Sequence, residues 1–315
     1  AMSLVRNLAS RAGCGLRREM WEDPGLSDAL VESAGDEVSG HRTYRAAAME
    51  ILQLLAAEDL NRLDMWDSAA KDVLLAAAGY TTVKAIQAQE FALAAIQEIS
   101  RSGCELAWRM WTGEGDDGGV RQVLIQEAKR TEPLLQVARS FAIAALQSMA
   151  RCQSLRASVW EQAGEALRVA AAPRILPAVL PCVQSNIRRW AYAGLSELAD
   201  GGAALKEDMW SSVGRVLVAG ASPKALDLQT RAYALAAMAR LLGAKALRLR
   251  MWAHKDGARY AILQGLAEDE TREAALSCLR RMSRSRLTRM PMWHNRVVQG
   301  ALVKAVGQTL AEAGR

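Results

Sequence analysis

The dipeptide Met-Trp recurs along this chain, and its spacing decides the fold. It occurs at Met20-Trp21, Met65-Trp66, Met110-Trp111, Met209-Trp210, Met251-Trp252 and Met292-Trp293, and Val159-Trp160 fills the one gap. The tryptophan positions 21, 66, 111, 160, 210, 252 and 293 are separated by 45, 45, 49, 50, 42 and 41 residues. Periods of this length are typical of arrays of stacked helical repeats. The dipeptide therefore predicts such an array.

Two amphipathic segments are expected between successive Met-Trp pairs, and the second has the stricter pattern. It is counted from a polar anchor residue at Arg45, Gln89, Arg139, Arg188, Arg231 and Arg272. The third position after the anchor is always alanine (Ala48, Ala92, Ala142, Ala191, Ala234, Ala275), and the seventh is always large and apolar (Leu52, Ile96, Leu146, Leu195, Met238, Leu279). The tenth is large and apolar as well. Offsets of 3, 7 and 10 share one face of a helix, so the pattern predicts tightly packed helices.

The repeat boundaries follow from the Met-Trp pairs. We expect one array with a half repeat at 1–19, full repeats at 20–64, 65–109, 110–158, 159–208, 209–250 and 251–291, and a half repeat at 292–315. The leading half repeat is a helix around Leu4–Ala9, and the trailing one is a helix from Val297 to about Ala313. Both half repeats would expose an apolar face, because internal repeats normally cover one another. The pattern therefore predicts a piece of a longer chain, or copies that associate end to end.

Composition narrows the class of protein. The five cysteines (Cys14, Cys104, Cys152, Cys182, Cys278) lie far apart, without metal-ligand or disulfide spacing, which favours buried thiols in an intracellular, reducing compartment. No apolar run is long enough for a transmembrane helix, so no membrane insertion is expected. The net charge of +6 is uneven: residues 240–315 contain 15 Lys/Arg and 6 Asp/Glu, whereas the preceding residues contain 25 and 28.

The second helices resemble the third helix of armadillo repeats. The likeness is clearest in Phe141–Ala150, Arg189–Ala199 and Ala232–Leu241, and it recurs along nearly the whole chain. The resemblance to the armadillo/HEAT family implies an all-α, right-handed α-solenoid that binds a protein partner in a concave groove or serves as a structural subunit. Peptide-binding armadillo proteins present asparagine at the ninth position after the anchor. This chain has Leu54, Glu98, Ser148, Glu197, Arg240 and Arg281 there, so an asparagine ladder is not available.

The candidate partner-binding groove contains an aromatic ladder. The second position after the anchor is aromatic in four consecutive repeats, at Phe91, Phe141, Trp190 and Tyr233, and the fifth position beside it is small. By analogy with the armadillo fold, this stripe lies toward the concave side. Glu98, Glu197, Arg240 and Arg281 at the ninth position complete the candidate groove. The alternative is that the rings pack against the preceding repeat.

A second candidate surface is a basic patch near the C-terminus. It consists of Arg248, Arg250, Arg280, Arg284, Arg286 and Arg289, which could attract RNA or an acidic partner or form an ordinary solvated face. RNA binding through these repeats is thus the alternative function.

No pattern in the sequence indicates catalysis. The histidines His41, His254 and His294 lack partners at useful spacing, and no phosphate-binding, zinc-protease or serine-hydrolase motif occurs. The glycine-rich loop 113–119 contains two aspartates but lacks the spacing of a calcium loop. The tryptophans could stack on a cofactor or a base, but packing between repeats is the favoured interpretation. We therefore expect a protein without enzymatic activity, cofactor or metal.

Overall fold

The computed structural model describes residues 1–35, 42–80, 82, 85–113, 119–172, 179–223, 227–253 and 257–303. Some sequence-based expectations concern residues outside these ranges. They are the histidines His41 and His254, the loop residues 114–118, Pro173 and Pro177, and the trailing segment from residue 304, with Val306 and Leu310.

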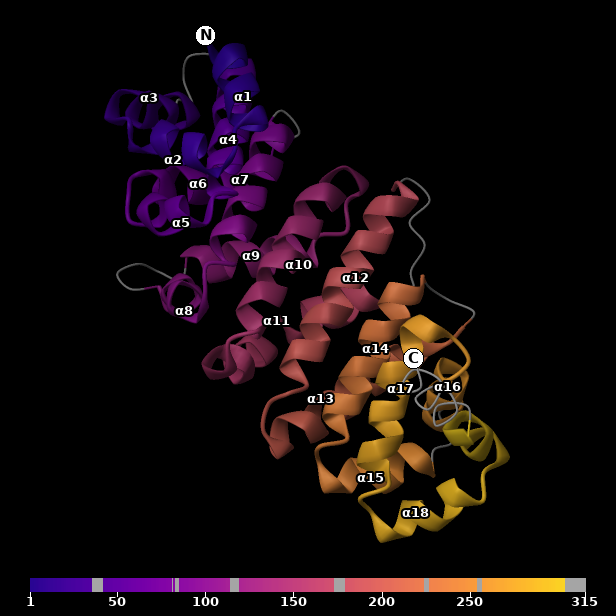
Figure 1. Ribbon diagram of the computed structural model, residues 1–315. Coiled ribbons are helices and arrows are strands. Elements are labelled where there is room, and N and C mark those ends of the chain that lie inside the picture. Colours follow the sequence, from indigo (N-terminus) through magenta and orange to yellow (C-terminus); the bar gives the residue numbers. More distant parts are fainter. Residues whose placement is uncertain are drawn as a thin grey trace. The chain divides into compact units, whose positions relative to one another are not determined.

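Every regular element in the described ranges is helical, which confirms the all-α prediction (Figure 1). The chain divides into two compact units. Unit 1 comprises 1–166 and 176–190, and unit 2 comprises 167–175 and 191–315. The helices α11 (Arg156–Ala171) and α12 (Pro181–Leu198) are therefore shared between the units.

Unit 1 is built from repeats of three helices, here named H1, H2 and H3 in chain order. The first repeat contains α2 (Cys14–Glu22), α3 (Pro24–Gly35) and α4 (Arg42–Ala56); the second contains α5 (Asp59–Trp66), α6 (Ala70–Ala78) and α7 (Ile86–Ile99); the third contains α8 (Cys104–Thr112), α9 (Gly119–Lys129) and α10 (Gln136–Ala150). Each H2 packs on its own H3, and α4, α7 and α10 pack side by side. The leading helix α1 (Met2–Arg11) packs on α4, as expected for the tail of an H3 helix.

Unit 2 repeats the same packing. Helix α13 (Ala203–Ala221) packs on α14 (Leu228–Leu241), and α14 packs against α17 (Asp269–Met282). The last described repeat has α15 (Lys245–Trp252) as H1, α16 (Ala258–Gly265) as H2 and α17 as H3. It is followed by α18 (Arg286–Trp293) and a helical segment at 296–303.

Met-Trp ends a short helix of its own, which the two-helix interpretation of the repeat missed. Helices α5, α15 and α18 end at Trp66, Trp252 and Trp293, and α2 and α8 continue one residue further. In α11 and α13 the first two helices of the repeat are fused into one. Pro24 begins a new helix three residues after Trp21, whereas α5 and α6 are separate although neither proline nor glycine lies between Trp66 and Gly79.

The Met-Trp side chains pack within the repeats. All six methionines of the pairs are buried, as are Trp21, Trp66, Trp111, Trp210 and Trp252, whereas Trp293 is 59% exposed. In the fused helices a glycine four residues later leaves room for the ring. A Cβ added to Gly214 would lie 3.0 Å from the Trp210 ring, and one added to Gly164 would lie 2.7 Å from the Trp160 ring. The packing interpretation therefore holds for the five buried rings.

In several repeats the polar anchor of H3 donates to a backbone carbonyl at the end of H2. Arg45 Nε donates to the Ala34 carbonyl at 2.9 Å, and Gln89 Nε2 donates to the Ala78 carbonyl at 3.1 Å. Arg139 Nε donates in the same way to Ala128 at 3.0 Å. The last carbonyls of a helix have no partner within the helix, so a side chain that bonds to them stabilises the turn. The anchor Arg231 differs, since it pairs with Glu268 and its Nε has no hydrogen-bond partner in the described part of the chain.

A second arginine satisfies the end of H3. It stands four residues before the tryptophan, at Arg17, Arg62, Arg156, Arg248 and Arg289. Arg62 Nε donates to the Ala56 carbonyl at 3.0 Å, Arg248 Nε to Leu242 at 3.1 Å and Arg289 Nε to Ser283 at 3.1 Å. These arginines fix the turn from each H3 helix into the next H1 helix.

Candidate partner-binding surfaces

The exposed stripe of the H3 helices is the first candidate surface, and we name it the H3 face. It contains the second, fifth and ninth positions after the anchor, because these offsets share one side of a helix. On α7 these positions are Phe91, Ala94 and Glu98. The third, seventh and tenth positions, exemplified by Ala92, Ile96 and Ile99, are completely buried. The predicted packing stripe is therefore buried, and Ala94, which lies between the partly exposed Phe91 and Glu98, is nearly buried as well.

All four members of the predicted aromatic ladder are partly exposed. Phe91 on α7, Phe141 on α10 and Trp190 on α12 belong to unit 1, and Tyr233 on α14 belongs to unit 2. The small residues beside them, Ala94, Ala144 and Ala193, are 5%, 3% and 4% exposed. The rings therefore stand above a floor of alanine methyl groups. Because α7 packs directly on α10, Phe91 and Phe141 lie on neighbouring helices of one surface.

The ninth position does not form the simple gradient of charge that the sequence suggests. Glu98 is bound by Arg62 at 3.4 Å and by Arg101 at 3.1 Å. In unit 2, Arg240 pairs with Glu197 at 2.9 Å and also donates to the Ser196 carbonyl at 2.8 Å. Arg281 is partly exposed on α17. Glu98, Glu197 and Arg240 therefore hold neighbouring helices together, which reduces the charge that they offer to a partner.

Glu90 lies beside the H3 face, at the first position after the anchor, and did not stand out in the sequence. It precedes Phe91 on α7 and is partly buried. Burial raises the pKa of its carboxyl group. The first position after the anchor carries no consistent residue type, so no sequence signal marked it.

The basic patch separates into two groups of arginines. Arg248 and Arg289 use their guanidinium groups on the backbone carbonyls described above. Arg250, Arg280, Arg284 and Arg286 are exposed, and their guanidinium groups make no hydrogen bond or ion pair within the described residues. Only this second group is fully available to an anion.

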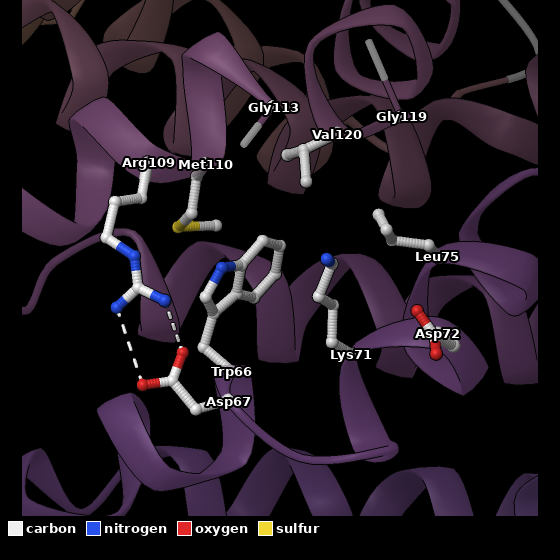
Figure 2. A pocket seen from close by; sticks show the side chains of 10 residues that line it. All are labelled: Trp66, Asp67, Lys71, Asp72, Leu75, Arg109, Met110, Gly113, Gly119 and Val120. Atoms are coloured by element: carbon white, nitrogen blue, oxygen red, sulfur yellow. Dashed lines mark hydrogen bonds and ion pairs between the residues drawn. The ribbon is translucent and has the colours of Figure 1, made fainter. Parts of the chain in front are cut away.

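A pocket between consecutive H1–H2 pairs of unit 1 was not foreseen (Figure 2). Its volume is about 340 Å³, and its walls come from Trp66, Leu75, Met110 and Val120 together with charged side chains. Arg109 binds Asp67 at 2.5 Å on one side of the Trp66 ring, and Lys71 lies over the ring at 5.8 Å from its centre.

The lining of this pocket has balanced charge and no strained or catalytic group. It has room for an apolar side chain of a partner. The sequence signal for it was the insertion after Met110-Trp111, since Gly113 and Gly119 at the two ends of that loop line the pocket.

The remaining residues of reactive or metal-binding types form no cluster in the described part of the chain. No group of three His, Cys, Asp or Glu side chains is placed to hold a metal ion there. No described helix is long and apolar enough to cross a membrane. The cysteines differ from the expectation of buried thiols, because Cys14, Cys104 and Cys182 are exposed and only Cys152 and Cys278 are buried. Cys14 and Cys104 are the first residues of α2 and α8, and Cys182 is the second residue of α12, so the three thiols lie at helix starts and not in the packed interiors of the helices.

Comparison with solved structures identifies the fold. A designed armadillo repeat protein, YIII(Dq)4CqI, superposes with a TM-score of 0.65 at 14% identity, over 81% of this chain and 98% of that one. The chain has the armadillo-repeat fold. A second designed armadillo repeat protein, in complex with the peptide (KR)4, gives the same TM-score, identity and coverage. The prediction of an all-α solenoid with armadillo-like repeats is thereby confirmed.

A natural armadillo-type neighbour comes from a study of the interaction between cadherin and beta-catenin. It has a TM-score of 0.61 at 17% identity, over 84% of this chain and 47% of that one. No protein-family model and no curated protein matches the sequence. At these identities the likeness establishes the fold alone.

Proposed function

We propose that this chain is a non-enzymatic scaffold that binds a segment of a partner protein on the H3 face. The observation that supports the proposal most directly is the partial exposure of Phe91 and Phe141 above small, buried alanines on two neighbouring helices. Rigid aromatic rings bury much apolar area at a small cost in conformational entropy, which suits them to anchor a partner.

The residues at the ninth position favour recognition through side chains. Glu98 and Glu197 are already engaged by arginines, and Ser148 donates to the Ala144 carbonyl at 3.2 Å. None of them is an amide that could both donate to and accept from the backbone of an extended peptide. The partner segment would therefore present apolar side chains to the rings and the alanine floor between them.

Structural neighbours agree with this proposal at a coarser level. One designed armadillo repeat protein is in complex with a peptide, and the natural neighbour comes from work on a protein–protein interaction. Armadillo-type proteins are rarely enzymes, and the described residues form no catalytic arrangement.

Selection of peptides from a displayed random library against the full chain tests the proposal. Selected peptides are then titrated against wild type and the double variant Phe91→Ser/Phe141→Ser. Loss of two anchoring rings should weaken binding by about 30-fold at least and by about 900-fold if their effects add, since a hot-spot residue contributes roughly 2 kcal/mol or more. Trp108→Ser is the matched control, because Trp108 is an exposed aromatic residue (39%) on α8, away from the H3 face. Peptides that tolerate the double variant but lose affinity for Trp108→Ser would contradict the proposal.

A further inference from the structure

Helix α18 presents large apolar side chains and arginines on the same exposed side. Leu287, Met290 and Trp293 are 66%, 57% and 59% exposed. Arg286 lies four residues before Met290 and seven before Trp293, so these three side chains share one side of the helix. Thr288 and Met292, on the opposite side, are buried. We name the exposed residues of α18, together with Arg284 of the preceding turn, the α18 surface.

The charge of this region has one sign. Arg280, Arg284 and Arg286 are exposed, and their guanidinium groups make no hydrogen bond or ion pair within the described residues. No Asp or Glu occurs in the sequence between Glu273 and Glu312, whereas arginine occurs at 280, 281, 284, 286, 289 and 296. The guanidinium groups are therefore not neutralised along their own segment.

Leu287 and Met290 occupy positions that are exposed on an H1 helix of another repeat as well. They stand six and three residues before Trp293, and their counterparts in the second repeat are Leu60 and Leu63, six and three residues before Trp66. Leu60 and Leu63 are also exposed, at 67% and 48%, but their neighbours Asp59 and Asp64 form ion pairs with Arg62 and Arg18. The same apolar pair thus has charge-paired neighbours on α5 and, within the described residues, unpaired arginines beside it on α18.

We propose that the α18 surface docks peripherally on an anionic lipid bilayer. The bilayer interface suits this combination, because Trp, Leu and Met side chains enter the boundary between headgroups and acyl chains while arginines bind the phosphates. A nucleic acid would bind the arginines through its phosphates and stack a base on Trp293. It offers no apolar region that would bury Leu287 and Met290. The apolar pair therefore favours the membrane surface over RNA.

Co-sedimentation of the full chain with vesicles tests this assignment. Vesicles of phosphatidylcholine with about 30% phosphatidylserine are compared with vesicles of phosphatidylcholine alone, at low and high salt. Wild type should bind the anionic vesicles, bind the neutral ones far more weakly, and dissociate at high salt because the arginine contribution is screened. Arg284→Gln/Arg286→Gln should weaken binding by about 25-fold, since each arginine near an anionic surface contributes roughly five-fold.

Substitutions of the apolar pair Leu287 and Met290 distinguish binding to a membrane from binding to other polyanions. Leu287→Ser/Met290→Ser should weaken vesicle binding by about ten-fold or more, because these side chains lose their burial in the interface. The matched control is Leu60→Ser/Leu63→Ser, which should bind the vesicles like wild type; both pairs are exposed, so circular dichroism should show each variant folded.

Two outcomes would overturn the proposal. One is vesicle binding that is absent, indifferent to lipid charge, or equally reduced by the α5 control. The other is binding of poly(U) RNA that depends on Arg284 and Arg286 but not on Leu287 and Met290, with no competition from anionic vesicles. The inference does not rest on the H3 face, so a failed peptide selection would leave it standing.

Discussion

Glu127 on α9 is a carboxyl group in an unfavourable environment. It is 1% exposed, and one of its oxygens has no hydrogen-bond partner. Its neighbours are Arg130 at 3.0 Å, Gln89 of α7 and Glu132. Desolvation raises its pKa to about 7, against the opposing effects of Arg130 and of the hydrogen bond from Gln89. The folded state therefore retains a proton that the unfolded chain has lost.

This shift makes stability depend on pH in a defined window. The folded state binds more protons than the unfolded state between the ordinary pKa of 4.5 and the raised value of about 7. The free energy of unfolding should therefore fall as pH rises through this window. Glu127→Gln should remove this fall, so that the variant is more stable than wild type above pH 7 and about equal to it near pH 4. Urea denaturation at several pH values measures the effect, with Glu161→Gln at an exposed position as the control. An unchanged pH dependence in Glu127→Gln would contradict the assignment.

The burial of two of the five cysteines predicts how many thiols react in the folded protein. Burial raises the pKa of Cys152 to about 12 and that of Cys278 to about 12, so both remain protonated and covered at pH 8. Cys14, Cys104 and Cys182 are exposed. Titration with Ellman's reagent should therefore count three thiols quickly in the folded protein and all five after denaturation. A rapid count of five in the folded protein would show that the two buried thiols are accessible.

Among single residues, the sequence predicted those whose role repeats. The anchors Arg45, Gln89 and Arg139 were found because several repeats satisfy equivalent carbonyls in the same way. Arg248 and Arg289 were assigned to a binding patch because their charge is visible in the sequence, whereas their carbonyl partners are not. Glu127 and Glu90 left no signal, since burial in the folded chain causes their raised pKa values and no repeated residue type marks it.

At the scale of elements, the fused helix α13 depends on the absence of a side chain at Gly214. Alanine in a helix interior is normally favoured over glycine by about 1 kcal/mol. Here the added Cβ would lie 3.0 Å from the ring of Trp210, which is 5% exposed and has little room to move. Gly214→Ala should therefore destabilise the protein by about 1–2 kcal/mol in spite of its better helix propensity.

Urea denaturation followed by circular dichroism measures this effect. The control is Gly300→Ala, because a Cβ there meets nothing within 4 Å. That substitution should be neutral or stabilising. Stabilisation by both substitutions would show that Trp210 yields easily and that the glycine has no packing role.

The H3 helices were the elements that the sequence predicted best. Their pattern of alanines and large apolar residues reflects a packing stripe that is the same in α7, α10 and α14. The H1 helices were missed because they are short, with eight residues in α5, α15 and α18, and have too few turns to show a period. Whether H1 and H2 fuse depends on the few residues after the tryptophan, which vary between repeats.

For the whole molecule, the period predicted the repeats and the armadillo-type fold, but not the division into two units. The sequence between the units contains prolines at 173, 177 and 181. The interval that contains them, from Trp160 to Trp210, is the longest at 50 residues, but this length does not indicate where one unit ends and the next begins. The period also contains no information about the partner, because it depends on how the helices pack and not on what they bind.

The central claim is that a partner segment lies on the H3 face. Photo-crosslinking measures this most directly: benzoylphenylalanine replaces Phe91 or Phe141, or replaces Tyr260 on α16, which is 59% exposed. A peptide selected against the wild-type chain should crosslink from positions 91 and 141, with adducts located by mass spectrometry, and should not crosslink from position 260. Efficient crosslinking from position 260, with none from positions 91 and 141, would place the partner elsewhere and contradict the claim.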